Sequence, residues 1–330
     1  MTKKTIAFVT GGYSGEAVIS YKSAITIENN IDTSKYDYYK IDINLTGWWY
    51  ETPLGEKIAV DKNDFSLTFD DRKITFDAVL IGIHGTPGED GKLQGYLDML
   101  KIPYTGCNGS ASALTFNKRY TVATVAFGGI HVAKSVCLIK NNFTNYDEVV
   151  AQLQFPVFVK PNNGGSSIGM SKVDQPTEEL GVAIEKAFKE DDQVLVEELI
   201  NGREFSIGVF RHNDQIITLP ITEIISKNDF FDYEAKYVSG KSDEITPANV
   251  NEVIANKLRV AAEKIYTILN CRGIVRIDFI YNDAKGEPFM LEVNTVPGQS
   301  EASIVPQQVK VMGWSLKEFY TKLVQECFGE

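Results

Sequence analysis

The chain has 330 residues, a formal net charge of −11 and 43% hydrophobic residues. This length suggests two or three domains, and the composition is ordinary for a globular protein. The acidic balance argues against a nucleic-acid partner, because non-specific binding to nucleic acid needs a basic surface.

Two further patterns bear on location. No apolar run is long enough to span a membrane, and the N-terminus lacks a signal-peptide pattern, so we expect no membrane association. The cysteines are widely spaced and form no CxxC or Cys/His pattern. We therefore expect reduced thiols in a cytoplasmic protein, without a disulfide framework or zinc site.

The first segment predicts the start of an α/β domain. Thr5 to Thr10 reads TIAFVT, typical of a buried strand, and a glycine-rich turn and a helix from about Glu16 to Asn29 follow. The helix N-terminus would suit an anion. The GGxxG spacing is not the dinucleotide fingerprint, so a Rossmann cofactor site is only weakly indicated.

A second glycine-rich loop follows the strand predicted at Asp77 to Ile83. It begins at His84 and leads into a helix predicted at Lys92 to Leu100. Open α/β sheets bind ligands at the carboxyl ends of their strands, so His84 is a ligand candidate, although a lone histidine is more often structural. A helix predicted from Ser110 to Lys118 marks the first domain boundary.

The middle of the chain carries a candidate phosphate site. The strand predicted at Phe155 to Lys160 ends in a lysine, and a Gly/Ser/Asn-rich loop follows at 161–170. Backbone N–H groups and hydroxyls in such a loop suit phosphate oxygens, whereas the simpler alternative is a plain hairpin loop. No P-loop sequence occurs in the chain.

Further acidic residues come from the next two strands. Gln193 to Leu199 delivers Glu197 and Glu198, and the following strand carries Glu204. The long polar stretch from Ile224 to Ala248 predicts a functional closing loop. Other helices are predicted at 177–189, 250–269 and 316–327.

The stretch from Cys271 to Gly298 predicts a hairpin that carries the chemistry. Arg276 and Asp278 lie two apart on one strand, and Glu292 and Asn294 lie two apart on the other, so each pair shares a face. Two carboxylates and an amide oxygen suit Mg²⁺, and the arginine suits phosphate or a developing oxyanion. A solvated sheet face is the ordinary alternative for such a pattern.

Together these segments resemble the ATP-grasp ligases, and most closely the D-alanine–D-alanine ligase family. The resemblance covers nearly the whole chain, and the motifs in this order are far more specific than any one alone. They are GGYSGE at 11–16, HGTPGEDGKLQG at 84–95, YTGCNGSASALTFNK at 104–118, VKPNNGGSSIGMSKV at 159–173, EELINGREFS at 197–206, DYEAKY at 232–237, RIDF at 276–279 and LEVNTVPGQSEASIVP at 291–306.

The resemblance implies a mixed α/β and α+β fold, the three-domain ATP-grasp architecture. A Rossmann-like substrate domain would span residues 1–115, a central ATP-grasp domain 116–206, and a C-terminal catalytic domain 207–330, with a closing loop at about 226–246. The resemblance also implies a homodimer, which the sequence itself does not show.

The same resemblance implies ATP and two Mg²⁺ or Mn²⁺ ions as cofactors. The metal ligands would be Asp278, Glu292 and Asn294. The nucleotide would be bound by Lys118, Lys160, Ser167, Glu197, Glu198, Leu199, Glu204 and Lys236.

Two D-alanine molecules would be the other partners. The resemblance assigns the first to Glu16 and His84, the acyl phosphate and oxyanion to Arg276 and the backbone of Gly298, and the carboxylate of the second to Ser303 and Ile304. It also implies a triad that ties the closing loop to the other domains, formed by Glu16, Ser166 and Tyr237.

The implied function is ATP-dependent ligation of two D-alanines through a D-alanyl phosphate, releasing ADP and phosphate, for peptidoglycan precursors. D-alanine–D-lactate ligation is an alternative that Tyr237 argues against. Another carboxylate–amine ligase of this class is a second alternative. A non-catalytic nucleotide-binding regulatory protein is a third, which the retained lysines, Arg276 and metal-ligand set disfavour.

Overall fold

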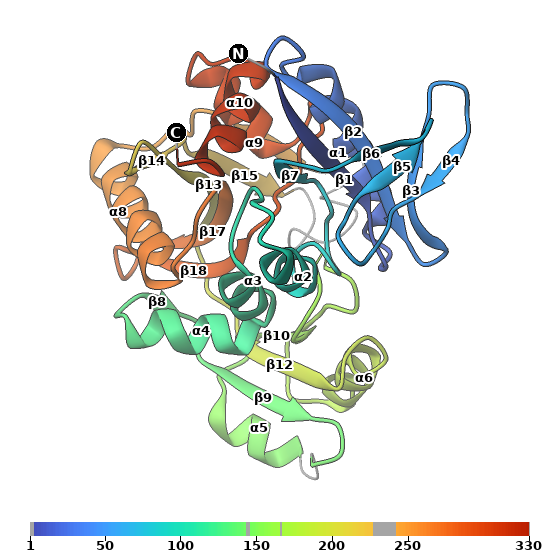
Figure 1. Ribbon diagram of the computed structural model, residues 1–330. Coiled ribbons are helices and arrows are strands. Elements are labelled where there is room, and N and C mark those ends of the chain that lie inside the picture. The colour runs from blue at the N-terminus through green and yellow to red at the C-terminus, as the bar shows by residue number, and fades with distance from the viewer. Residues whose placement is uncertain (1–2, 143–145, 166, 227–241, 330) are drawn as a thin grey trace.

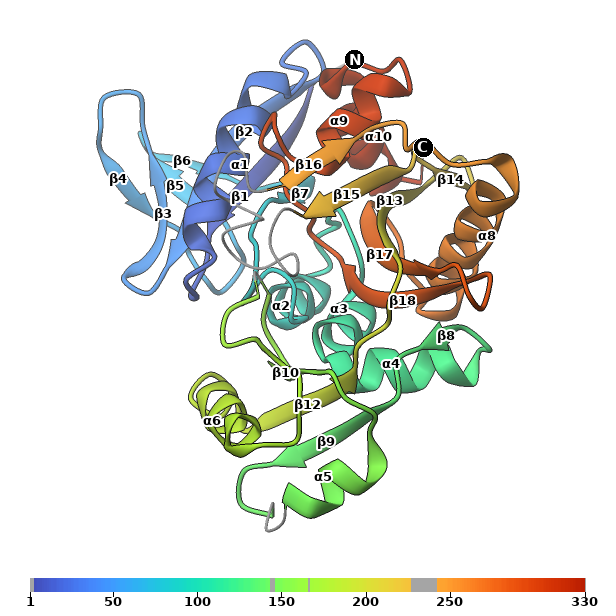
Figure 2. The same cartoon turned by 180° about the vertical axis from the view of Figure 1, so that it is seen from behind.

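The structure is a computed structural model that describes residues 3–142, 146–165, 167–226 and 242–329. Three main sheets follow one another along the chain, and in both views helices α2 (Lys92–Leu100) and α3 (Gly109–Phe116) lie between the first sheet and the second (Figure 1, Figure 2). In the part of the chain that the structure describes, no helix is long and apolar enough to cross a membrane.

The N-terminal sheet has the predicted α/β organisation. Strand β1 (Lys4–Gly11) pairs in parallel with β2 (Tyr36–Asn44) and with β7 (Ala78–Ile81), and α1 (Ala17–Asn30) connects the first two. The chain therefore reverses its strand order beside β1, which is where open α/β sheets bind ligands. The smaller strands are β3 (Gly47–Glu51), β4 (Lys57–Ala59), β5 (Leu67–Phe69) and β6 (Arg72–Ile74).

The central sheet has the strand order β11-β10-β12-β9. In β10 (Val157–Pro161), Val157 and Val159 are buried under the helices, so Phe158 and Lys160 point to the opposite face. The other elements here are β9 (Ser135–Ile139), α5 (Tyr146–Gln152), β11 (Ser171–Val173), α6 (Glu178–Ala187) and β12 (Gln193–Glu198).

The third sheet contains the predicted hairpin and has seven strands in the order β16-β15-β13-β17-β18-β8, with β14 paired to β13. Its strands are β8 (His131–Val132), β13 (Arg203–His212), β14 (Gln215–Thr218), β15 (Thr222–Ser226), β16 (Ser242–Ile245), β17 (Val275–Asn282) and β18 (Glu287–Asn294). Its helices are α4 (Lys118–Phe127), α8 (Glu252–Ile268), α9 (Ile304–Val311) and α10 (Leu316–Glu326).

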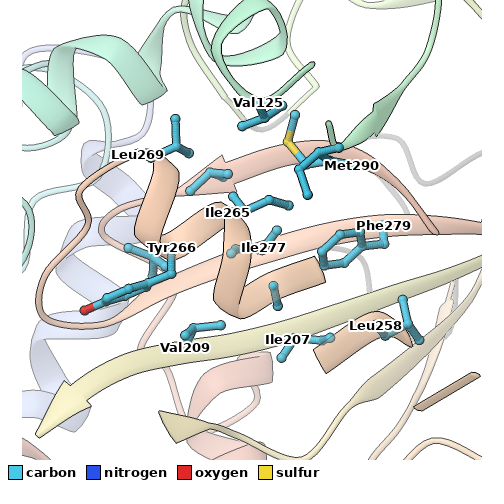
Figure 3. Packing of buried hydrophobic residues seen from close by; sticks show 14 of the residues in the cluster. Val125, Ile207, Val209, Leu258, Ile265, Tyr266, Leu269, Ile277, Phe279 and Met290 are labelled. Atoms are coloured by element: carbon cyan, nitrogen blue, oxygen red, sulfur yellow. The ribbon is translucent and has the colours of Figure 1, made fainter. Parts of the chain in front are cut away.

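One face of this sheet is covered by α8. Leu258 and Ile265 of the helix pack over Ile277 and Phe279 of β17 (Figure 3), and all four side chains are fully buried. Because side chains alternate across a strand, burying Ile277 and Phe279 on this face turns Arg276 and Asp278 to the other face. The packing of the core thus orients the polar residues of the hairpin.

The described ends of the predicted closing loop are regular strands. These ends form β15 and β16, which pair with each other so that Ser226 lies opposite Ser242. Residues 227–241 lie outside the described residues. The proposed domain boundary at residue 206 falls inside β13, and the one at residue 115 falls inside α3. We therefore propose that the third domain begins before Arg203, which keeps β13 whole.

The burial of Phe279 predicts its energetic weight. Phe279→Ala is expected to lower the free energy of unfolding by about 3–5 kcal/mol, because it removes a large side chain from a packed core and leaves a cavity. Phe127→Ala is the matched control, since that ring is 97% exposed, and it should change stability by less than about 0.5 kcal/mol. Urea-induced unfolding measures both, and equal effects would contradict the packing described.

Candidate active site

Three cavities meet at the hairpin. The largest, about 570 Å³, lies between the central and third sheets, and a second of about 310 Å³ lies between the N-terminal loops and the start of α9. A small cavity of about 40 Å³ is bordered by residues of both regions. Glu292 lines all three cavities, so the hairpin is a wall common to them.

The large cavity has the form of a nucleotide cleft. Phe158 and Met170 line it from the central sheet, and Ile280 and Leu291 line it from the third sheet, so a flat ring would lie between apolar side chains. Glu197 on β12 faces the same space and forms an ion pair with Lys160, and both side chains are largely buried. A polar edge beside apolar walls is what an aromatic base requires.

Two lysines mark one part of this cleft. Lys118, the first residue of α4, reaches the glycine-rich loop, where its Nζ donates to the carbonyl oxygen of Gly164 at 2.5 Å. Lys160 and Ser167 border the same cavity. The ammonium groups of Lys118 and Lys160, together with the glycine-rich loop, form a cationic region suited to phosphate oxygens.

The other predicted nucleotide contacts that the structure describes are Glu204, Glu198 and Leu199, and the last two have hydrogen-bond partners within the protein. Glu204 lines the large cavity from β13. The carboxylate of Glu198 accepts the backbone N–H of Gln154 at 2.9 Å, and the N–H of Leu199 donates to Pro156 at 3.0 Å. Because these groups of Glu198 and Leu199 already have partners, other atoms of the two residues would have to meet the nucleotide.

The hairpin register brings the predicted metal ligands together. Asp278 lies opposite Glu292, and Arg276 lies opposite Asn294, with a bulge just after Asp278. The Arg276 guanidinium donates from Nε at 2.9 Å and from Nη2 at 2.7 Å to the two Asp278 oxygens. Ser206 donates its hydroxyl to Asp278 Oδ1 at 2.6 Å.

The donor set fits a divalent cation completed by phosphate. Among the described residues there is no cluster of three or more His, Cys, Asp or Glu side chains that would bind a metal alone. Asp278 and Glu292 instead offer two carboxylates on the wall of the nucleotide cleft, and Asn294 offers an amide oxygen beside the small cavity that adjoins it. Mg²⁺ commonly takes one or two carboxylates and fills its remaining positions with phosphate oxygens and water.

Glu16 lies where the N-terminal part, the central loop and the hairpin meet, because it lines the small cavity together with Gly165 and Glu292. It lies at the N-terminus of α1 and is only 9% exposed. A Cβ atom at Gly85 would lie 2.5 Å from Glu16 Oε2, and one at Gly165 would lie 2.6 Å from Oε1. The carboxylate therefore fits between the second N-terminal loop and the glycine-rich loop only because both positions lack a side chain.

His84 lies in the same region and is buried. Ser23 Oγ accepts the N–H of Gln299 at 3.1 Å and forms a hydrogen bond of 2.9 Å with His84 Nε2. The imidazole also forms a hydrogen bond with the backbone of Val296. Burial lowers the pKa of His84 to about 4, so the imidazole is neutral at physiological pH.

The second predicted substrate region is the start of α9. Ser303 precedes the helix, and its hydroxyl lies 2.8 Å from that of Ser300. A Cβ at Gly298 would lie 2.9 Å from Ser303 Oγ, so this glycine permits the close turn. Ile304 begins the helix, and a helix N-terminus of this kind suits a carboxylate.

Sequence families match both halves of the chain. Residues 5–107 match the family described as "D-ala D-ala ligase N-terminus" and residues 125–325 match "D-ala D-ala ligase C-terminus". The D-alanine--D-alanine ligase of Flavobacterium johnsoniae is 44% identical over 322 residues, which cover 98% of each chain. The enzyme of that name from Flavobacterium psychrophilum is 47% identical and covers 92% of this chain and 91% of its own.

The chain belongs to the D-alanine–D-alanine ligase family. Solved structures agree: the D-alanyl-alanine synthetase A of Vibrio cholerae superposes with a TM-score of 0.88 at 29% identity and covers all of both chains. The VanG D-Ala:D-Ser ligase of Enterococcus faecalis also gives 0.88, at 33% identity, over 99% of this chain and all of its own. The three-domain ATP-grasp fold implied by the sequence is confirmed.

Three of the predicted site residues have no structural description. Ser166, Lys236 and Tyr237 lie outside the described residues. All the other predicted site residues line a cavity. The predicted nucleotide residues line the first cavity, and the predicted substrate residues line the second, namely Glu16, His84, Arg276, Gly298, Ser303 and Ile304.

The sequence analysis missed Glu89. This carboxylate lines the small and second cavities and accepts the N–H of Gly85 at 2.6 Å and that of Val296 at 3.2 Å. Burial and the neighbouring Glu16 raise its pKa to about 8. Its place in the glycine-rich loop that starts at His84 is the signal that would have identified it.

The neutral state of His84 gives a measurable prediction. Its pKa of about 4 lies below the unfolded value of about 6.5, so its contribution to stability is full above pH 6.5 and falls as the pH drops towards 4, by about 3 kcal/mol in total. NMR titration of the ¹³C-labelled imidazole should show no change between pH 8 and 5. A midpoint near 6.5 would contradict the buried, neutral assignment.

Proposed function

We propose that the protein joins two D-alanine molecules to D-alanyl-D-alanine, converting ATP to ADP and phosphate, and so supplies peptidoglycan synthesis in the cytoplasm. The observation that carries the proposal is the position of the hairpin, whose Glu292 borders both the nucleotide cleft and the second cavity. A phosphoryl group leaving one cavity would meet an amino-acid carboxylate held in the other at this wall.

The first step makes the carboxylate of the first D-alanine reactive. A free carboxylate is a poor acylating agent because oxide is a poor leaving group, whereas an acyl phosphate carries a good one. Phosphoryl transfer depends on positioning and charge neutralisation, and Lys118 and Lys160 supply positive charge at the cleft. Bound Mg²⁺, held by Asp278, Glu292 and Asn294, would add charge neutralisation at the phosphates.

The second step is attack by the amine of the second D-alanine on the acyl phosphate. In this proposal Glu16 holds the ammonium of the first substrate, while Ser303 and the N-terminus of α9 hold the carboxylate of the second. The guanidinium of Arg276, with the backbone N–H of Gly298, faces the oxyanion that develops at the carbonyl carbon. Both residues line the second cavity.

An acyl phosphate hydrolyses readily, so the site must exclude water. The segment 227–241, which carries Lys236 and Tyr237, connects Ser226 of β15 with Ser242 of β16. Ser226 lines the nucleotide cleft and Glu244 of β16 lines the second cavity. The predicted closing loop therefore starts and ends beside the two cavities, and its central residues lie outside the described residues.

The identity of the second substrate has one specific competitor. The similarity to the D-Ala:D-Ser ligase of Enterococcus faecalis supports D-serine as a second candidate. With D-lactate as the second substrate, a hydroxyl rather than an amine would attack the acyl phosphate.

A direct assay separates these possibilities. Phosphate release from ATP and Mg²⁺ is measured with D-alanine alone and with D-alanine mixed with D-serine or D-lactate, and the products are identified by mass. The proposal requires release with D-alanine alone and the mass of D-alanyl-D-alanine. Product from the mixtures only would reassign the second substrate, and no release in any mixture would refute the ligase activity.

Arg276 provides the sharpest test of mechanism. Arg276→Ala is expected to lower kcat by about 10²–10³-fold, because it removes a fixed donor from the oxyanion. ATP affinity measured without a divalent cation should change little, since Arg276 lines the second cavity and its contact with the nucleotide cleft runs through the proposed metal ligand Asp278. Arg259→Ala, which removes a salt bridge to Glu252 on α8, is the control and should leave kcat unchanged. Unaltered turnover in Arg276→Ala would exclude the role.

We also propose the homodimer implied by the family. Helix α1 exposes Val18, Tyr21 and Ile25, with exposed fractions of 59%, 43% and 64%, at a spacing that places them on one face. Sedimentation should show a dimer, and Ile25→Glu should shift it to monomer by placing a charge in the contact. A wild-type monomer at micromolar concentration would refute the proposal.

A further inference from the structure

A row of polar side chains crosses the third sheet on the face that lines the cleft. Thr222 of β15 lies opposite Ser206 of β13, Ser206 lies opposite Asp278 of β17, and Asp278 lies opposite Glu292 of β18. Thr222 and Ser206 are fully buried, and Asp278 is nearly so. The proposed metal ligands are therefore the outer end of a buried row, and Ser206 is the inner neighbour of Asp278.

Ser206 gives Asp278 its shortest hydrogen bond. Its hydroxyl donates to Asp278 Oδ1 at 2.6 Å, and Arg276 Nε donates to the same oxygen at 2.9 Å. Asp278 Oδ2 accepts from Arg276 Nη2 at 2.7 Å and, at 3.3 Å, from Asn294. Arg276 lies on the same strand as Asp278 and has a long, flexible side chain. The Ser206 hydroxyl is on a short side chain in a neighbouring strand, so it fixes the carboxylate relative to the sheet.

Gln308 of α9 holds the strand segment that carries Ser206. Its Nε2 donates to the Ser206 carbonyl at 2.9 Å and to Thr222 Oγ1 at 3.0 Å, and its Oε1 accepts the N–H of Gly208 at 3.0 Å. At this point β13 ends its pairing with β15 and begins its pairing with β14. The amide of Gln308 supplies the donor and acceptor that a neighbouring strand would otherwise provide.

The same helix reaches the second cavity. Gln308 lies one turn after Ile304, the residue at the N-terminus of α9 that lines the cavity. Gln308 is fully buried, and a Cβ at Gly208 would lie 2.8 Å from its Oε1, so there is no space for it to move towards the strand. The buried amide of Gln308 thus links the first turn of α9 to β13, the strand next to Asp278.

We propose that Ser206 is a positioning residue for the metal ligand Asp278, and that Gln308 acts through Ser206 to hold the metal site and the second-substrate site in fixed relation. This rests on the proposed function, because it takes Asp278 as a ligand of the divalent cation. Groups that orient a metal ligand typically change metal affinity by about 10–100-fold when removed.

The test measures metal binding without turnover. Mn²⁺ is titrated into the full-length protein with a saturating non-hydrolysable ATP analogue and no amino acid, and bound Mn²⁺ is followed by electron paramagnetic resonance. Ser206→Ala should weaken Mn²⁺ binding about 10–100-fold, whereas Ser206→Thr, which keeps the hydroxyl, should stay within about threefold of the wild type.

Ser112→Ala is the matched control. Ser112 is also a fully buried serine, but its hydroxyl bonds to the carbonyl of Cys107 away from the cavities, so its loss should leave Mn²⁺ affinity unchanged. Ser206→Cys keeps the side-chain volume and replaces a strong donor with a weak one. It should weaken Mn²⁺ binding in the same direction, and it provides the comparison if the alanine variant does not fold.

A double-mutant cycle tests the part assigned to Gln308. Gln308→Leu should weaken Mn²⁺ binding in the wild-type background and have much less effect when Ser206 is already alanine. Full additivity of the two changes would refute action through Ser206. A stable Ser206→Ala protein that binds Mn²⁺ like the wild type would refute the positioning role, whereas a wild type that binds no Mn²⁺ with nucleotide would refute the proposed metal site itself.

Discussion

The carboxylate of Asp278 is almost completely removed from water, and the fold around it is constrained by the need to satisfy that charge. A buried charge is tolerated only when it is paired and hydrogen-bonded. Here the partners come from three adjacent strands: Ser206 of β13, Arg276 of β17 and Asn294 of β18. A slip of one residue between two of these strands would turn the partners on one strand to the opposite face of the sheet. The hydrogen bonds to Asp278 therefore favour the observed strand register.

Because side chains alternate along β17, one face of this strand packs in the core and the other lines the cavities. Ile277 and Phe279 fill the core beneath α8, and Arg276 and Asp278 face the cavities. The apolar face contributes most of the stabilisation, because burying large apolar side chains is the dominant favourable term in folding. The polar face is held rigidly by that core, which is the support that charge-stabilising catalysis requires.

The sequence predicted the regular elements well where a single periodicity dominated. The helix at Lys92 to Leu100 and the hairpin from Val275 to Asn294 lie where the pattern placed them. The sequence did not reveal that β8 joins the third sheet, because that pairing is made between segments more than 150 residues apart. Ser206 and Gln308 were missed for the same reason: their roles depend on neighbours in space, and each is an ordinary polar residue in its local sequence.

Glu16 shows why the active site needs the N-terminal and central parts of the molecule together. Its carboxylate comes from the N-terminal part, and it lies against Gly85 of the second N-terminal loop and Gly165 of the central loop, where any larger residue would collide with it. Glu89, buried beside it, cannot keep its full charge in this setting, which is why its pKa rises. Two acidic groups in one poorly solvated space favour a cation between them. The proposed binding of an amino-acid ammonium at Glu16 agrees with that preference.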